Sequence, residues 1–194
     1  MALTSVPLTA ETFEDFAALV DAHGGVFGGC WCLGFHDRSL FALPYAEKRE
    51  RKRQMVIGGQ AHAALVYAGS DCVGWCQFGS PEELPQIKNR RNYEAGLSGE
   101  AAPPWRLTCF FVHRRHRGLG VARAALAGAL AEIARQGGGL VEAYPEDVHQ
   151  ARVSPTFLHA GTLAMFEAAG FAKVAQIGKN KWVVRRQVAA AGAD

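Results

Sequence analysis

The sequence predicts a single α/β domain in which helices pack on both faces of a mixed central β-sheet. Apolar runs of strand length alternate with amphipathic helical segments along the 194 residues, 49% of which are hydrophobic. Pairs of runs joined by short turns flank one strand–helix–strand unit, a combination typical of a mixed sheet. No internal repeat or Ser/Pro-rich linker divides the chain. We therefore expect one domain over residues 1–188 and a frayed tail over residues 189–194.

Helix caps and turn residues define the elements of the N-terminal half. Thr9 is the expected N-cap, and the pair Gly24-Gly25 the expected stop, of a helix with one apolar face. A second helical segment, AEKRERKRQ, mixes acidic and basic side chains that are expected to face solvent. In order, we expect a strand at 3–8, helices at 10–22 and 45–57, and a hairpin formed by 61–68 and 72–78.

The C-terminal half begins with a long, polar, Pro-containing segment at 79–104. Loops of that length are uncommon without a function, so this segment is a candidate lid over a substrate. Glycines 137–139, Pro145 and Gly170 end successive elements. In order, we expect a strand at 105–112, a helix at 118–135, a strand at 140–144, a helix at 162–169, and a closing hairpin formed by 171–177 and 182–186.

Composition and charge argue against several classes of protein. The sequence begins without a signal-peptide pattern and contains no apolar run near the ~20 residues of a membrane span. Five cysteines, an odd number without a secretion signal, indicate reduced thiols. We therefore expect a soluble, cytoplasmic protein with no membrane partner. A net charge of +3 is low for a nucleic-acid-binding protein, so binding of DNA through residues 49–53 and 113–117 is a lesser alternative.

The segment RHRGLG, Arg115 to Gly120, lies between an expected strand and an expected helix. The unpaired N–H groups and the dipole of a helix start favour a negative charge, and glycines let a phosphate approach the backbone closely. The chain has no G-x-x-x-x-G-K-[ST] motif, and Gly120 is not followed by the third glycine of a G-x-G-x-x-G motif. The segment suits a pyrophosphate, and the alternative is an ordinary tight turn with solvated arginines.

This segment resembles the acyl-CoA signature [Q/R]-x-x-G-x-[G/A] of the GNAT superfamily of CoA-dependent N-acyltransferases. The later segment GTLAMFEAAGF, residues 161–171, resembles that family's second landmark, a helix that ends in a Gly-Phe pair before a hairpin. The order of elements matches from about residue 3 to residue 188. The resemblance implies acetyl-CoA, or a close acyl-CoA, as co-substrate and direct transfer of the acyl group to a primary amine.

The resemblance also implies which residues hold the acyl-CoA. The strands at 105–112 and 140–144 would run parallel and splay to admit the pantetheine arm. A backbone N–H on the first of these strands could then steady the thioester oxyanion. The CoA-binding residues implied in this way are Phe111, Val112, Arg115, His116, Arg117, Gly118, Leu119, Gly120, Val121 and Phe166.

The sequence departs from the family where proton transfer is expected. Phe166 stands where the family usually has a tyrosine that acts as the general acid, and His159 stands where the family often has an asparagine. Glu142 and Tyr144 share one face of their strand and are the predicted catalytic pair, one as a water-linked base and the other as an acid. Alternatively the thiolate leaves unprotonated, and the pair forms an ion pair and packing contacts. Further candidates are the imidazoles of His113, His116 and His159.

No metal site is expected. The C-x-C spacing of Cys30 and Cys32, and the strand position of Cys72 and Cys76, depart from the usual spacing of zinc ligands. Buried, reduced thiols explain these residues more simply. Cys109, on the acyl-binding strand, is a conceivable nucleophile, but direct transfer needs none.

The sequence leaves the acceptor amine open between a small metabolite, an antibiotic amine, and a protein N-terminus or lysine. The loop VFGGCWCLGFH and the segment 79–104 are where the acceptor is expected to bind. An acyl-CoA sensor or regulatory module without turnover is the rival hypothesis, and an exposed closing hairpin would suit a homodimer. The side chains available for an aromatic wall are Trp31, Phe35, Trp75 and Trp105, and those available to meet a cationic amine are Glu82, Glu83 and Glu94.

Overall fold

The computed structural model describes residues 2–97, 99–148 and 159–192, which contain one seven-stranded sheet with the order β1-β2-β3-β4-β5-β7-β6. Only β4 and β5 pair in parallel, and every other neighbouring pair among the described strands is antiparallel. The strands are β1 (Leu3–Pro7), β2 (His62–Ala68), β3 (Asp71–Gly79), β4 (Trp105–Val112), β5 (Gly139–Ala143), β6 (Ala172–Gln176) and β7 (Trp182–Val188).

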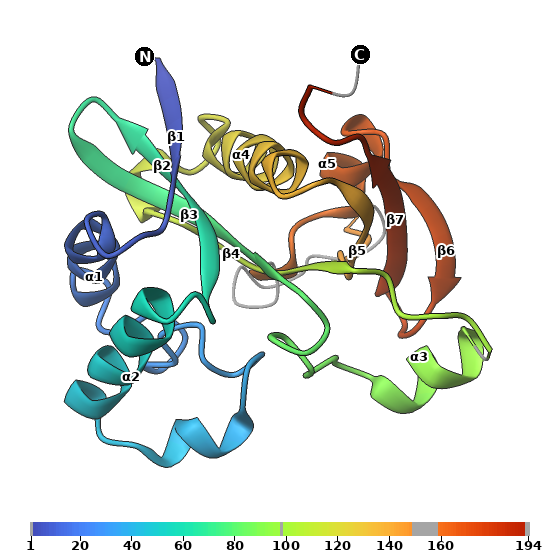
Figure 1. The fold of residues 1–194 in the computed structure, drawn as a ribbon, viewed down its shortest axis with the longest axis horizontal. Coiled ribbons are helices and arrows are strands. Elements are labelled where there is room, and N and C mark those ends of the chain that lie inside the picture. Colours follow the sequence, from blue (N-terminus) through green and yellow to red (C-terminus); the bar gives the residue numbers. More distant parts are fainter. Residues whose placement is uncertain (1, 98, 149–158, 193–194) are drawn as a thin grey trace.

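Helices cover both faces of this sheet, as Figure 1 shows, so the predicted fold class is confirmed. The pair α1 and α2 packs on one face, and the pair α4 and α5 packs on the other. The helices are α1 (Phe13–Asp21), α2 (Tyr45–Ile57), α3 (Arg90–Gly96), α4 (Val121–Arg135) and α5 (Leu163–Ala168), with short 3-10 turns at Arg38–Ala42 and Arg114–His116. None of the described helices is long and apolar enough to span a bilayer.

Strand β4 loses its β5 neighbour partway along its length. The parallel ladder consists of Trp105↔Val141, Arg106↔Glu142 and Leu107↔Ala143. On the other side, β3 pairs with β4 as far as Val112, and a register shift leaves Thr108 without an opposing residue. Pro145 follows the end of β5 and has no N–H to extend the ladder. The β5-facing edge of residues 108–112 therefore has no strand partner among the described residues.

Two apolar cores form on the two faces of the sheet. Under α4 and α5, Phe166 is fully buried and its ring meets the rings of Phe110 and Phe171 edge-on, at centroid distances of 5.9 and 5.0 Å. Under α1 and α2, Trp75 stacks on Phe111 at 4.8 Å. Because side chains of a strand alternate between faces, Phe110 and Phe111 of β4 anchor the two cores separately.

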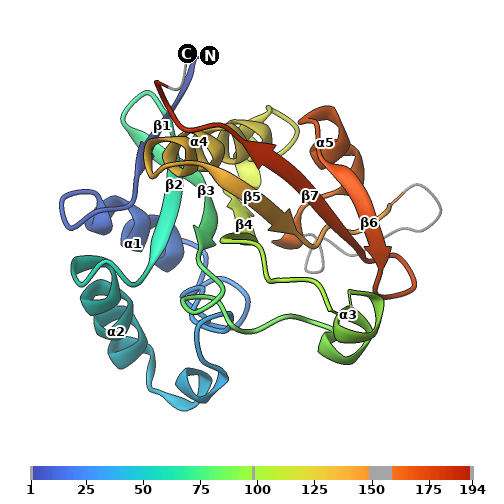
Figure 2. The same cartoon turned by 45° about the vertical axis from the view of Figure 1, so that its right-hand side comes forward.

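Three local expectations need comment. The segment 79–104 contains α3, which lies beside β6 in Figure 2, so this segment is not entirely a loop. The charged face of α2 was expected in solvent, but this is wrong for Lys48 and Lys52, which are 9% and 1% exposed. For Lys52 the ammonium group is buried as well, and it contacts His36 Nε2 at 3.3 Å. The boundary at residue 188 stays a prediction, although the N–H of Ala191 donates to the Ala134 carbonyl at 2.8 Å.

The burial of Phe166 leads to a stability prediction. Replacement Phe166→Ala should lower the free energy of unfolding by about 3–5 kcal/mol, because it removes a buried ring and leaves a cavity. The control is Val174→Ala, since Val174 is 40% exposed, and a change within about 0.5 kcal/mol is expected there. Urea unfolding followed by tryptophan fluorescence measures both, and equal losses would contradict the described packing.

Candidate functional site

The loop at residues 113–120, which joins β4 to α4, has the geometry of an anion site. Gly118 and Gly120 have φ angles of +77° and +85°, in the left-handed region that glycine favours. No atom lies within 4 Å of a Cβ built on Gly118, so the space above this backbone is open. Gly120 is the N-cap of α4 and provides no side-chain cap, so the first-turn N–H groups are available to a ligand.

Positive charge surrounds this open backbone. Arg114, Arg115, Arg117 and Arg123 are exposed, and within the described part of the chain none of them forms an ion pair. An uncompensated group of guanidinium ions at a helix start attracts a multiply charged anion. The predicted residues 115–120 thus form a positively charged loop at the start of α4, which we call the cradle.

His113 orders the start of the same loop. Its Nδ1 accepts a hydrogen bond from the N–H of Arg115 at 3.1 Å. Partial burial, followed by the nearby imidazoles of His23 and His116, lowers the pKa of His113. A neutral ring can accept this bond, whereas a protonated ring cannot. The structure therefore places His113 as a component of the loop.

A pocket, named here the Cys109 pocket, lies on the face of the sheet that α1 and α2 cover and has a volume of about 490 Å³. Its walls come from the loop after α1, the Arg38–Ala42 turn, the segment before α3, and β4. The lining has an aromatic part, a thiol part and a polar part. These are the rings of Phe27, Phe35, Phe41 and His159, the thiols of Cys30, Cys32 and Cys109, and the side chains of Arg38, Gln86 and Lys88.

The thiols of this pocket are close to one another and reduced. Cys32 Sγ donates to Cys109 Sγ at 3.1 Å. This contact, and then burial, raises the pKa of Cys32, and a contact with Cys32 raises that of Cys30. Cys30 and Cys32 therefore stay protonated and are poor nucleophiles. The described residues contain no group of three His, Cys, Asp or Glu side chains placed to hold a metal ion.

A buried lysine, Lys52, lies behind the thiols. His36 Nδ1 donates to the Glu83 carbonyl at 3.0 Å, so its Nε2 is the acceptor that faces Lys52 Nζ at 3.3 Å. Burial, and then the charge of Lys52, lowers the pKa of His36 to about 2. Burial also lowers the pKa of Lys52, and no described carboxylate bonds to it. The amide of Gln77 fixes His36 Nε2 from the other side at 2.6 Å.

A series of rings connects the pocket with the loop. The ring of His159 lies 5.5 Å from Phe27, and Phe27 lies 6.2 Å from Phe111 of β4. Phe111 then meets His23 at 4.9 Å, and His23 meets His113 at 4.6 Å. A row of ring contacts on one face of β4 therefore links the cradle loop to the Cys109 pocket.

In the predicted pair, Glu142 belongs to β5 and Tyr144 lies one residue beyond its end, and the two side chains bond to each other. Glu142 is fully buried, and its Oε1 accepts from the hydroxyls of Tyr144 at 2.6 Å and Tyr93 at 2.9 Å. Its Oε2 accepts from Arg185 Nε at 2.9 Å. Burial, and then Glu142, raises the pKa of Tyr144, so this hydroxyl stays protonated. Neither residue lines the Cys109 pocket.

Most residues considered for acceptor binding lie elsewhere. Trp31 and Trp75 belong to the core, and Trp105 donates its indole N–H to the Gly138 carbonyl. Glu83 pairs with His62 and Glu94 with Arg90. Of the residues listed for the wall, only Phe35 lines the pocket. The loop at 26–36 also contributes Phe27, Cys30 and Cys32 to the pocket, and its role in binding the acceptor stays a prediction. The sequence analysis missed Arg38, Phe41, Gln86 and Lys88, which share no periodic pattern.

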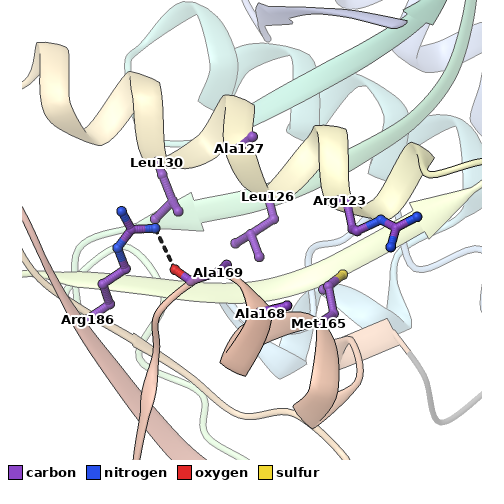
Figure 3. A pocket seen from close by; sticks show the side chains of 8 residues that line it. All are labelled: Arg123, Leu126, Ala127, Leu130, Met165, Ala168, Ala169 and Arg186. Atoms are coloured by element: carbon purple, nitrogen blue, oxygen red, sulfur yellow. Dashed lines mark hydrogen bonds between the residues drawn. The ribbon is translucent and has the colours of Figure 1, made fainter.

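A second hollow, the α4–α5 groove, lies on the opposite face of the sheet and has a volume of about 420 Å³. Figure 3 shows its apolar floor with Arg123 at one end and Arg186 at the other, the latter donating to the Ala169 carbonyl at 2.6 Å. Its lining contains no carboxylate, imidazole or thiol. The groove therefore lacks groups for proton transfer, and the Cys109 pocket is the better candidate for the reacting centre.

Comparison with known proteins identifies the family of the chain. The model of the acetyltransferase (GNAT) family matches residues 27–153, so the chain belongs to this family. It is accordingly an N-acetyltransferase whose co-substrate is acetyl-CoA. A search of curated proteins found no match.

Solved structures share the fold at low sequence identity. The chain is similar to yncA, a putative acetyltransferase from Salmonella typhimurium with its cofactor acetyl-CoA, with a TM-score of 0.55, 14% identity, and coverage of 100% of this chain and 98% of that chain. It is also similar to the PaiA N-acetyltransferase from Thermoplasma acidophilum in complex with coenzyme A, with a TM-score of 0.54, 11% identity, and coverage of 96% and 99%.

The depressed pKa of His36 predicts a dependence of stability on pH. The unfolded chain binds a proton at this residue below its ordinary pKa of about 6.5, whereas the folded protein does so only near pH 2. Stability from this group is therefore present above about pH 6.5 and is lost as the pH falls, at up to about 1.4 kcal/mol per pH unit. We expect His36→Gln to remove this slope between pH 6 and pH 5.

Urea unfolding at pH 8, 7, 6 and 5 measures the slope independently of any constant loss of stability. His62→Gln is the control, because His62 is only partly buried and pairs with Glu83. An unchanged slope in the His36 variant would show that the imidazole is charged in the folded protein.

Proposed function

We propose that this acetyltransferase moves the acetyl group directly from acetyl-CoA to a primary amine held in the Cys109 pocket. The observation that carries the proposal is the row of ring contacts on one face of β4 that links the cradle to this pocket. Acetyl-CoA supplies the acyl thioester when bound. Every other requirement of the reaction falls on the residues of the chain: they bind, orient, and move protons.

In this proposal the β4–α4 loop holds the pyrophosphate and β4 holds the arm that carries the thioester. The first-turn N–H groups of α4 and the open backbone of Gly118 and Gly120 support the first role. The missing β5 partner of residues 108–112 supports the second, because unpaired backbone groups can bond to an extended ligand. The residues proposed to bind the co-substrate are Phe111, Val112, Arg115, His116, Arg117, Gly118, Leu119, Gly120, Val121 and Phe166.

Val121 and Phe166 are almost fully buried and have separate roles. The side chain of Val121 is 1% exposed and packs toward Gly74, so Val121 contributes its backbone N–H. The ring of Phe166 has no exposed surface and supports β4 through Phe110. A direct contact of Phe166 with the co-substrate stays a prediction.

Two sets of side chains are candidates for proton transfer. Glu142 and Tyr144 form a hydrogen-bonded pair at the end of β5, from which a water could reach the amine. His159 lies between Phe27 and Phe35 in the wall of the Cys109 pocket, which favours it as the group nearest the amine. Lys52 and Lys88 both lie close enough to Cys109 to feel its charge, so a departing thiolate in this region would be stabilised without an acid.

The rival hypothesis of a regulatory module has no supporting observation in the structure or in the family match. Amine-dependent release of free CoA thiol tests the proposal against it. Release with at least one amine is expected. Binding of acetyl-CoA without release for any amine would favour the module.

A pair of glycine variants tests the cradle. Gly118 and Gly69 both have positive φ angles, of +77° and +68°, and both have open space around a built Cβ. Alanine therefore strains the backbone similarly at both positions, by roughly 1 kcal/mol. We expect Gly118→Ala to raise the Kd for acetyl-CoA at least tenfold, measured by calorimetry, and Gly69→Ala to leave it unchanged. Equal Kd values would remove Gly118 from the site.

A pair of tyrosine variants tests the predicted catalytic pair. Tyr144 and Tyr93 both donate to Glu142 Oε1, so either replacement by Phe removes one hydrogen bond from the same atom. If Tyr144 transfers a proton, Tyr144→Phe lowers kcat by roughly 10²-fold or more while Tyr93→Phe does not. If both tyrosine variants lower kcat only slightly and His159→Gln lowers it strongly, proton transfer is assigned to His159. The Kd for acetyl-CoA serves as the check that each variant is folded.

A further inference from the structure

The Cys109 pocket is built for an apolar group. Phe27, Phe35 and Phe41 line it, and Phe27 and Phe41 are 37% and 49% exposed although they belong to the most apolar residue type. Burying such rings is favourable at roughly 25 cal/mol per Å², so their shared exposure around one hollow indicates a ligand that covers them. A ligand with polar groups alone would leave these rings exposed to water.

The backbone is strained to present these rings. Phe27 and Cys32 have φ angles of +44° and +50°, which are rare for residues with side chains. Phe41 lies so close to Gly34 that a Cβ on this glycine would be 2.2 Å from the ring. Val26 and Trp31 of the same loop also have positive φ angles, and two of these four residues, Phe27 and Cys32, line the pocket. Strain of this kind is retained where the arrangement has a use.

The same pocket carries positive charge and no negative charge. Arg38 and Lys88 line it, none of its described lining residues is acidic, and neither cation forms an ion pair among the described residues. Both side chains are exposed at the edge of the pocket. Desolvation, and then the charge of Lys181, lowers the pKa of Lys88, whereas Glu146 raises it. The buried Lys52 lies behind Cys32. An anionic group in the pocket would therefore gain ion pairs and reduce this repulsion.

We infer that the acceptor is a small amine that also carries a carboxylate and an aromatic or bulky apolar side chain, as an apolar amino acid does. Its side chain would lie among the phenylalanines, and its carboxylate would meet Lys88 and Arg38. This inference rests on the proposed function, since it concerns the acceptor of that reaction. A polyamine does not fit, because each additional ammonium would approach uncompensated cations.

The positive pocket also assists the reaction itself. An ammonium near Lys88 loses its proton more readily than in water, which yields the neutral amine that attacks. The amine nitrogen then forms a bond to the acyl carbon while the carbon–sulfur bond breaks. The electron pair of that bond leaves on sulfur, and one proton from the attacking nitrogen is released. The products are an N-acetylated acid and CoA, and no oxidant or reductant is required.

A panel of amines at saturating acetyl-CoA tests the inference. The panel comprises L-phenylalanine, L-phenylalaninamide, phenethylamine, glycine and spermidine, with kcat/KM measured from thiol release. We expect L-phenylalanine to exceed the two amines that lack its carboxylate, and glycine that lacks its ring, by at least tenfold each. Spermidine should be the poorest acceptor. Preference for phenethylamine or spermidine would overturn the inference and leave the proposed acetyl transfer intact.

Charge variants identify the residues involved. Lys88→Gln and Arg38→Gln should reduce the ratio of kcat/KM for L-phenylalanine over phenethylamine at least fivefold each, and Lys88→Arg should retain it. Lys179→Gln is the matched control, because Lys179 is an exposed lysine of the β6–β7 turn that lines neither hollow. An unchanged ratio in both glutamine variants would contradict the assigned carboxylate partners.

A binding measurement keeps the inference testable if thiol release is absent. Calorimetry with N-acetyl-L-phenylalanine and the protein–CoA complex should detect binding that weakens at least fivefold in Lys88→Gln. Binding of CoA without any thiol release would refute the proposed function, whereas absence of binding by the N-acetylated acid would refute the inference.

Discussion

The separation of β4 from β5 is the constraint on which the site depends. The parallel ladder stops after Leu107 and Ala143, and Pro145 prevents its extension. A central strand with one unpaired edge is costly, because its backbone groups lose hydrogen bonds inside the protein. In this fold the cost is localised where a ligand can replace the missing strand. The antiparallel pairing with β3 continues to Val112 and holds β4 in place.

The basic side chains of the candidate site form two groups, one on the β4–α4 loop and one at the Cys109 pocket. The arginines of the β4–α4 loop are exposed, so their attraction is long-range and is screened by salt. Lys52 is 1% exposed and lies deeper, where a charge interacts more strongly, whereas Lys88 is exposed at the edge of the Cys109 pocket. The group on the loop therefore suits capture of a multiply charged ligand, and the group at the pocket suits control of protonation at the reacting atoms.

The fold could be predicted from the sequence, whereas the lining of the Cys109 pocket could not. Residues 45–57 and 105–112 match α2 and β4, because strong periodicity and glycine or proline stops are local signals. The burial of Lys52 was missed, since its charged helix face looks solvated until the loop carrying His36 folds over it. Phe41 and Lys88 come together only through the tertiary fold, so neither has a local signal. The role of Glu142 depends on Arg185 and Tyr93, which are distant in sequence.

The position of β7 has a consequence for synthesis of the chain. β7 lies between β5 and β6, yet it follows both of them in the sequence. Until residues 182–188 leave the ribosome, β5 and β6 cannot complete the sheet, and each presents an unpaired edge that another chain could join. The arginine that pairs with Glu142 belongs to the same late strand. Until then that carboxylate lacks its guanidinium partner, so the buried ion pair is completed only when the sheet closes.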